Sequence, residues 1–277
     1  MITRRRFTQI VGAAATAAAA RPALASSALS SPKRGCCLAA RADGKWRRRV
    51  EVLQPNWMYS WGAHRPEGLA PDIDFTPMLW GEDSKERRRR LIVDLKSRYE
   101  SGEVRHVLGF NEPDQPDQSN MAVKRVLNLW PQLMEIGAPL VSPGCVHPDK
   151  EWMRSFMAGV EERSLRVDAI AVHSYMGPSV EHLMRKLEAV HREFGRPLWL
   201  TEFAVGDWEA SSPAANRHRP ERIAAFMREV LPALDEASFV DRYAWFNASP
   251  KSAPLGTSSL VDDEGEPTPL GELYASH

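Results

Sequence analysis

Two glutamates, Glu112 and Glu202, stand where apolar segments of the sequence end or are interrupted. Two carboxyl groups that flank a glycosidic bond can hydrolyse it, one as a proton donor and the other as an ionised nucleophile. Either glutamate alone could instead cap a helix or pair with an arginine. We predict a catalytic pair, with Glu112 as acid/base and Glu202 as nucleophile, if the fold brings the two segments together.

Polar and aromatic residues near the ends of the same kind of segment could bind a sugar. Asn111 directly precedes Glu112 and could bind the hydroxyl group next to the reacting carbon. His173 could donate a hydrogen bond to Glu202 or to a sugar hydroxyl, or could be an ordinary core residue. Aromatic rings match the apolar faces of pyranose rings. The aromatic candidates are Tyr59, Trp61, Trp80, Tyr175, Trp208 and Trp245.

Other residues in these segments have two interpretations. His64, Asp72 and Asp74 either line sugar subsites or make a loop polar. Trp57 and Trp199 could also face a sugar, but we expect them in the core because large aromatic side chains usually fill protein interiors.

Short apolar segments alternate with amphipathic ones along the chain, which indicates repeated βα units and a parallel sheet. The predicted strands are Arg34–Ala39, Trp57–Trp61, Asp74–Trp80, His106–Phe110, Pro139–Pro143, Ala169–Ser174, Leu198–Phe203 and Tyr243–Phe246. Apolar residues at three- and four-residue spacing predict helices over Arg89–Tyr99, Ala122–Ile136, Trp152–Arg163, Val180–Phe194 and Glu221–Leu234. Residues suited to helix C-termini and N-caps flank the helical segments, namely Gly102, Gly137, Gly195, Ser119 and Thr268.

The fold class is therefore α/β. Within this class, eight βα units favour a single (β/α)8 TIM barrel over a doubly wound sheet. No Gly-x-Gly-x-x-Gly motif follows the first predicted strand. In such a barrel the active site lies at the C-terminal ends of the strands. Glu112 then follows the fourth strand and Glu202 lies at the end of the seventh, so the fold is expected to bring them together.

The composition is that of an ordinary globular enzyme, with 277 residues, 43% hydrophobic and 26% charged, and no net charge. Neutrality argues against nucleic acid as a partner, and we interpret the basic clusters Arg47–Arg49 and Arg87–Arg90 as solvated helix faces. No metal-ligand spacing is present, so no metal and no cofactor are expected. We expect the three cysteines, Cys36, Cys37 and Cys145, to be free buried thiols.

The N-terminus has the pattern of an export signal. Thr3–Phe7 contains three consecutive arginines, an alanine-rich apolar run follows over Ile10–Ala20, and small residues at Ala23–Ala25 suit a signal peptidase. This predicts a twin-arginine signal peptide over residues 1–25, a linker over 26–32 and one catalytic domain over 33–277. We therefore expect a secreted or periplasmic monomer that acts on a polysaccharide and, once the signal is removed, does not associate with a membrane.

Six motifs, in this order and spacing, carry a family resemblance: Asp74–Gly81, Leu108–Asp114, Gln118–Met121, Ala171–Tyr175, Trp199–Ala204 and Tyr243–Phe246. Together they resemble glycoside hydrolase family 128, the endo-β-1,3-glucanases, from about Lys33 to Tyr274. The resemblance implies a retaining double displacement on β-1,3-glucan. It also implies substrate contacts from Asn111, His173, Tyr175 and Trp245. The sequence departs from the expected pattern at Ser174, where we expect a bulkier or glycine-flanked residue.

Three other functions are consistent with parts of the sequence. The same barrel could hydrolyse a β-1,4-glucan or mannan, or the protein could bind glucan through its aromatic residues without turning it over. A metal-dependent hydrolase would need histidines at ligand spacing, which the sequence does not have. The two glutamates favour catalysis, with an activity optimum under mildly acidic conditions.

Overall fold

The computed structural model describes residues 30–277. The predicted signal peptide and residues 26–29 of the predicted linker lie outside the described residues. Ser30 and Ser31, at the end of that linker, contact the folded domain, where the side chain of Asn56 donates hydrogen bonds to the Ser30 hydroxyl and the Ser31 carbonyl. In the described part of the chain, no helix is long and apolar enough to cross a membrane.

Strands and helices alternate along the chain, as the apolar pattern predicts. The strands are β1 (Arg34–Cys37), β2 (Trp57–Tyr59), β3 (Asp74–Phe75), β4 (Val107–Leu108), β5 (Leu140–Val141), β6 (Ile170–Met176), β7 (Leu198–Val205) and β8 (Val240–Phe246). The α-helices are α1 (Lys45–Leu53), α2 (Lys85–Glu100), α3 (Val123–Met134), α4 (Glu151–Glu162), α5 (Val180–Phe194), α6 (Pro220–Glu236) and α7 (Pro269–Ala275). Two short 3-10 helices, η1 (Pro213–Ala215) and η2 (Gly256–Ser258), lie in the loops after β7 and β8. Each predicted strand and helix overlaps an observed one.

The strands form a parallel sheet with the order of a (β/α)8 barrel. Six strands pair in the order β3-β2-β1-β8-β7-β6, and β4 pairs with β5. Single parallel bridges join the two groups, Met78 with Leu108 after β3 and Val141 with Ala169 before β6. With these bridges, each strand has a neighbour on both sides, and β8 lies beside β1.

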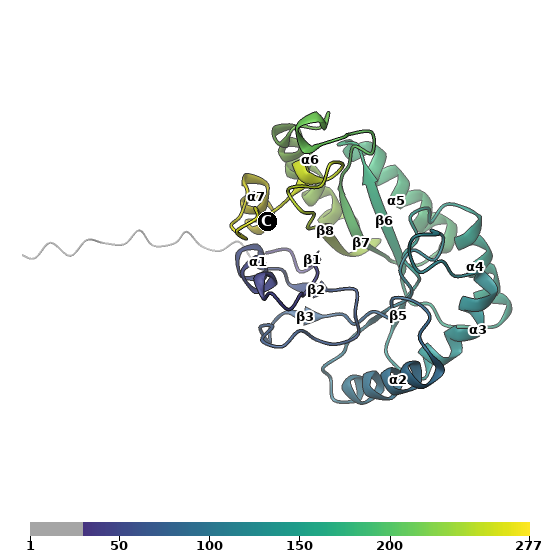
Figure 1. Ribbon diagram of the computed structural model, residues 1–277. Coiled ribbons are helices and arrows are strands. Elements are labelled where there is room, and N and C mark those ends of the chain that lie inside the picture. Colours follow the sequence, from purple (N-terminus) through teal and green to yellow (C-terminus); the bar gives the residue numbers. More distant parts are fainter. Residues whose placement is uncertain (1–29) are drawn as a thin grey trace, which may run out of the picture.

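The helices lie outside the strands (Figure 1). One βα unit is incomplete, because within the described residues no helix lies between β2 and β3. The prediction of eight complete units is therefore wrong at this point. The segment of residues 60–73 contains two glycines and two prolines, which disfavour a helix, and forms a loop instead.

Two layers of apolar side chains hold the barrel together. One cluster fills its interior with residues from or next to every strand: Cys37, Trp57, Tyr59, Met78, Leu108, Val141, Ala169, Ala171, Trp199 and Ala244. A larger cluster lies between the strands and the helices from α2 to α7. Trp57 and Trp199 are buried in the interior cluster, which confirms the expectation that they are core residues. The three cysteines are free and buried, as expected.

Most predicted helix ends are confirmed. The Thr268 hydroxyl accepts a hydrogen bond from the Gly271 amide and caps α7, and Gly195 ends α5 with φ of 61°. Ser119 is not an N-cap, because α3 begins after Ala122, which makes no side-chain cap.

Candidate active site

Glu112 lies four residues beyond β4, at the C-terminal end of the barrel. Its backbone has φ of 42°, in the left-handed region that few non-glycine residues adopt. The Glu112 amide donates a hydrogen bond of 2.8 Å to the Gly144 carbonyl, in the segment that follows β5. This contact between neighbouring segments holds the unusual backbone and fixes the direction of the side chain.

Glu202 reaches the same end of the barrel because of a β-bulge in β7. Val172 of β6 pairs with Leu200, whereas the next residue, His173, pairs with Glu202, so Thr201 is the extra residue. Strict alternation from Trp199, which faces the barrel interior, would turn Glu202 outward. The bulge reverses this parity and places Glu202 and His173 side by side, facing inward.

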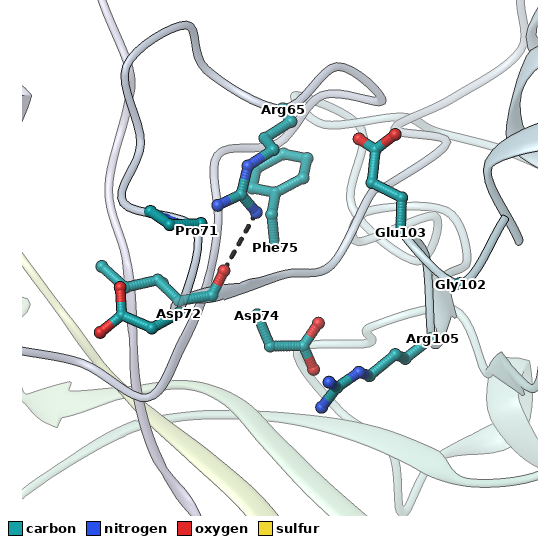
Figure 2. Close-up of a pocket in the computed structure, with 9 residues that line it drawn as sticks. Arg65, Pro71, Asp72, Asp74, Phe75, Gly102, Glu103 and Arg105 are labelled. Atoms are coloured by element: carbon teal, nitrogen blue, oxygen red, sulfur yellow. Dashed lines mark hydrogen bonds between the residues drawn. The ribbon is translucent and has the colours of Figure 1, made fainter.

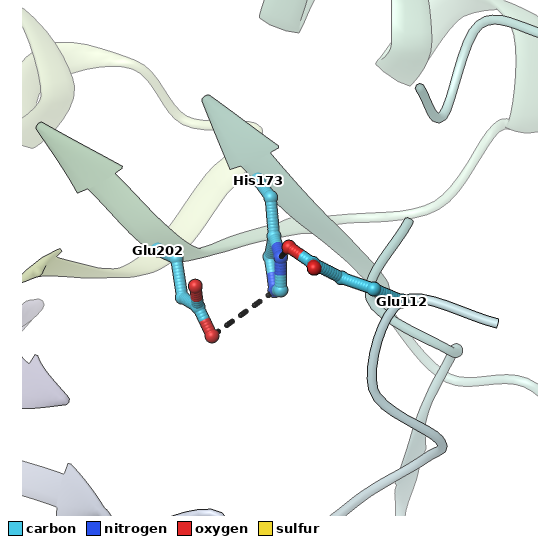
Figure 3. A group of neighbouring side chains, drawn as sticks. All are labelled: Glu112, His173 and Glu202. Atoms are coloured by element: carbon cyan, nitrogen blue, oxygen red, sulfur yellow. Dashed lines mark hydrogen bonds and ion pairs between the residues drawn. The ribbon is translucent and has the colours of Figure 1, made fainter. Parts of the chain in front are cut away.

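His173 lies between the two glutamates (Figure 3). Its Nδ1 atom is 2.7 Å from Glu112 Oε1, and its Nε2 atom is 3.6 Å from Glu202 Oε1. One oxygen of each glutamate and one nitrogen of His173 lie within 4.8 Å of one another. The predicted pair of carboxyl groups is therefore brought together, and both side chains are largely buried.

Three aromatic side chains donate hydrogen bonds to the Glu202 carboxylate. The Tyr59 hydroxyl and the Trp61 indole NH each lie 2.8 Å from Oε1, and the Tyr175 hydroxyl bonds to Oε2. Hydrogen bonds to an ionised carboxylate favour that form. The sequence predicts that these three residues bind the sugar. In the structure, their side chains donate hydrogen bonds to the Glu202 carboxylate.

The electrostatic surroundings of Glu202 are consistent with a negative charge there. Burial and the Glu202 carboxylate raise the pKa of the Tyr59 and Tyr175 hydroxyls well above the usual range, so both keep their protons and act as donors. Burial alone would lower the pKa of His173, but the Glu202 and Glu112 carboxylates outweigh burial and raise it.

The remaining predicted residues differ in their exposure. Asn111 is buried beside Glu112. Its amide NH2 donates to Gln118 at 3.3 Å, and no group in the described part of the chain bonds to its Oδ1. Trp80 is 41% exposed and is open to a ligand.

The prediction that Trp245 contacts the substrate is wrong. Trp245 is fully buried. Its ring packs on Phe203 and Tyr274 on the outer face of the barrel strands, and its indole NH donates to the Ser258 carbonyl. Its neighbour Phe246 faces the site instead, with its ring centroid 5.8 Å from that of Trp61 and 5.4 Å from that of Tyr175. Adjacent residues of a strand point to opposite faces, and the apolar sequence does not reveal which face is which.

Trp208, in the loop after β7, is another aromatic residue at this end of the barrel. It is 64% exposed, its ring packs edge-on against Tyr175, and its indole NH donates to the Tyr175 carbonyl. An exposed tryptophan fixed beside buried carboxylates is a platform on which a sugar ring could stack.

Asp72 and Asp74 do not line this site. They border a pocket of about 330 Å³ with residues that precede or begin β3 and β4, at the opposite end of the barrel (Figure 2). Arg65 closes one side of that pocket through a hydrogen bond to the Ile73 carbonyl. Asp74 pairs with Arg242 at 2.6 Å, so its role is structural.

One group among the described residues has ligand atoms close enough together to hold a metal ion. It consists of Glu112, His173 and Glu202. Protein donors already occupy both oxygens of Glu202, and His173 occupies Oε1 of Glu112. The arrangement brings two carboxyl groups together with one imidazole between them.

The chain is similar to known carbohydrate-active enzymes. The family described as Glycosyl hydrolase catalytic core matches residues 38–274. A family 128 (subgroup I) endo-β-1,3-glucanase from Amycolatopsis mediterranei, solved with laminaritriose, is 31% identical with a TM-score of 0.72, and the match covers 88% of this chain and 98% of that one. A subgroup III curdlan-specific exo-β-1,3-glucanase from Blastomyces gilchristii is 26% identical with a TM-score of 0.69, over 89% of this chain and 98% of that one.

A curated relative, Alkali-sensitive linkage protein 1 of Schizosaccharomyces pombe, is 29% identical over 230 residues. The matched region covers 80% of this chain but only 40% of that protein. On the match over residues 38–274 and the similarity to the Amycolatopsis enzyme, the chain belongs to the glycosyl hydrolase catalytic core family and is a member of glycoside hydrolase family 128.

Proposed function

We propose that this protein hydrolyses internal linkages of β-1,3-glucan with retention of configuration. The observation that carries the proposal is the distance between the two glutamates, which have oxygens within 4.8 Å of each other. Retaining glycosidases hold their carboxyl groups about 5–5.5 Å apart, whereas inverting enzymes need about 6.5–9.5 Å to admit a water molecule.

The reaction then has two steps. Glu112 donates its proton to the glycosidic oxygen while Glu202 attacks the anomeric carbon, which releases one part of the glucan and forms a glycosyl ester. Glu112, now a carboxylate, removes a proton from water, and the resulting hydroxide displaces Glu202 from the anomeric carbon. The hydrogen bonds from Tyr59, Trp61 and Tyr175 keep Glu202 ionised and oriented before the attack.

The linkage is supported by the relatives. The Amycolatopsis structure is described as an endo-β-1,3-glucanase in complex with laminaritriose. A subgroup II relative from Pseudomonas viridiflava, 28% identical with a TM-score of 0.71 over 89% of this chain and 98% of that one, is also described as an endo-β-1,3-glucanase. The exposed Trp80 and Trp208 would bind the glucan chain on either side of the cleaved bond.

The test is to incubate the purified protein with laminarin, curdlan, a β-1,4-glucan and a mannan, and to follow the reducing ends and the anomeric protons by NMR. We expect hydrolysis of the β-1,3-glucans, oligosaccharide products and initial release of the β-anomer. Initial release of the α-anomer would contradict retention, and release of glucose alone would contradict endo action.

Substitutions test the two roles. We expect Glu202→Gln to lower kcat at least about 10³-fold, and Glu112→Gln to lower it about 10²- to 10⁴-fold. Glu181→Gln, an exposed residue in the first turn of α5, is the control and should keep wild-type activity. Activity that survives both active-site substitutions would overturn the assignment, and binding of laminarin without any turnover by the wild type would favour a glucan-binding protein.

A further inference from the structure

We propose that His173 is a positioning residue that remains a cation between Glu112 and Glu202 throughout the reaction, rather than a residue that binds the substrate. This inference rests on the proposed function. It assigns a role to the side chain that lies between the two carboxyl groups.

The position of the ring excludes direct contact with a sugar. His173 is 1% exposed, and its Nδ1 atom is taken by Glu112 Oε1 at 2.7 Å. The backbone of Gly144 covers the other edge so closely that a Cβ atom at position 144 would lie 2.6 Å from Nε2. Both edges of the imidazole therefore face protein groups.

The Nε2 atom is buried and has no hydrogen-bond partner among residues 30–277, although Glu202 Oε1 lies 3.6 Å away. A neutral ring with its lone pair at Nε2 would point that lone pair toward an ionised Glu202, which is unfavourable. A neutral ring protonated at Nε2 would point its Nδ1 lone pair at Glu112, which is favourable while Glu112 carries a proton but unfavourable once Glu112 is the carboxylate. A ring protonated on both nitrogens instead donates Nδ1–H to Glu112 and directs the positive Nε2–H toward Glu202.

The charges of the reaction explain why such a cation is useful. Before cleavage Glu202 is ionised and Glu112 carries the proton; in the glycosyl ester Glu202 is neutral and Glu112 is the carboxylate. One negative charge thus moves from one side of His173 to the other. An imidazolium within 3.6 Å of an oxygen of each glutamate offsets this charge in both states, without moving.

The other charged and titratable groups around His173 come from several elements. Lys186 of α5 donates to the His173 carbonyl rather than to its ring, and burial lowers the pKa of this lysine. Asp114, after Glu112, adds a further negative charge. Tyr175 and Cys145 stay neutral, because burial raises the pKa of each well above its usual value. The carboxylates are therefore the nearest charges that His173 faces.

The kinetic test compares His173→Asn with the wild type over a range of pH. The asparagine amide can keep the hydrogen bond to Glu112 but carries no charge. Without the cation, the negative charge of the carboxyl pair is less stabilised, so we expect the acid limb of the kcat/KM profile to move up by about one pH unit. We also expect kcat to fall while KM stays within about threefold, since no sugar contact is lost. Ser174→Ala, next to His173 with an unpartnered hydroxyl, is the matched control and should leave the acid limb in place.

A lower kcat with an unmoved acid limb would show that His173 is merely structural. A raised KM with unchanged kcat would show that it binds substrate. Either result overturns the inference while leaving the proposed function intact, whereas a wild type that hydrolyses no glucan overturns the proposed function.

A second measurement needs no substitution at His173. The ¹⁵N NMR spectrum of histidine-labelled wild type should contain one imidazole with protons on both nitrogens at pH 7. That signal should persist after the glycosyl ester is trapped with a 2-deoxy-2-fluoro laminaribiosyl fluoride. A neutral buried imidazole in either state would overturn the inference.

Discussion

Glu202 differs from an ordinary buried carboxylate in the number of neutral donors that surround it. Tyr59 and Trp61 come from the end of β2, and Tyr175 comes from β6. A carboxylate with several donors stays ionised inside a protein, which suits a nucleophile. Glu112, by contrast, has one side-chain hydrogen-bond partner among the described residues, His173, which contacts its Oε1.

Removing one donor should therefore weaken catalysis without removing it. A hydrogen bond to a charged group contributes about 1.5–3 kcal/mol, so we expect Tyr59→Phe to lower kcat/KM on laminarin about 10- to 100-fold. Tyr243→Phe is the matched control, because its hydroxyl bonds to Asp235, far from the barrel mouth. That control should lower stability but leave kcat/KM unchanged; a Tyr59→Phe variant with wild-type kcat/KM would show that this hydroxyl does not support the nucleophile.

At the scale of the strands, the sequence predicts where elements lie better than it predicts which way their side chains point. The run Leu198–Phe203 is apolar on both faces, so alternation alone cannot orient Glu202. The bulge at Thr201, which turns Glu202 inward, has no signature in the sequence. The same uncertainty explains why the sequence points to Trp245 although Phe246 is the residue that faces the site. The positions of both glutamates could be predicted because each follows an apolar segment, whereas their hydrogen-bond partners depend on neighbouring strands.

The N-terminal end of the barrel is held by an ion pair between β3 and β8. Arg242 donates to Asp74 at 2.6 Å, and its guanidinium lies over the ring of Trp199, 4.4 Å from the centroid. Both side chains are mostly buried, so removing one partner leaves an uncompensated charge.

We expect Asp74→Asn to lower the free energy of unfolding by about 3 kcal/mol, measured by urea denaturation. Because this pair lies at the end opposite Glu112 and Glu202, kcat/KM under native conditions should stay near the wild-type value. Asp72→Asn, exposed on the same pocket, is the control and should change stability little. A large loss of activity from Asp74→Asn in a folded protein would contradict the separation of the two ends.

For the molecule as a whole, both ends of the described chain meet at the N-terminal end of the barrel. The Ser31 amide donates to the His277 carbonyl, and the His277 ring and the Ser31 hydroxyl both contact Asp235. The chain enters β1 from this end, away from the glutamates. The export signal over residues 1–25 stays a prediction.

Stability of the whole barrel should depend on pH through His106, which precedes β4. Burial, with a smaller contribution from the nearby Arg242 guanidinium, lowers the pKa of His106 to about 4. In the unfolded chain a histidine has a pKa of about 6.5, so between these values the unfolded state binds more protons than the folded one. The stabilising contribution of neutral His106 is therefore complete above about pH 6.5 and is lost as pH falls toward 4. The contribution of His173 to stability depends on pH in the opposite direction. Because the pKa of His173 is raised, its contribution is present at low pH and is lost as the pH rises through the pKa of the folded state.

Denaturation in urea at pH 7 and at pH 4.5 separates the effect of His106 from general acid destabilisation. We expect the wild type to lose free energy of unfolding between these pH values, and His106→Gln to lose less, because glutamine takes up no proton on unfolding. Other acid-sensitive groups, such as Asp207 with its pKa held low by Arg217, contribute equally to both proteins and cancel in the comparison. His64→Gln replaces an exposed histidine and should keep the wild-type dependence. If His106→Gln loses as much stability as the wild type, the buried imidazole is not the group that takes up the proton.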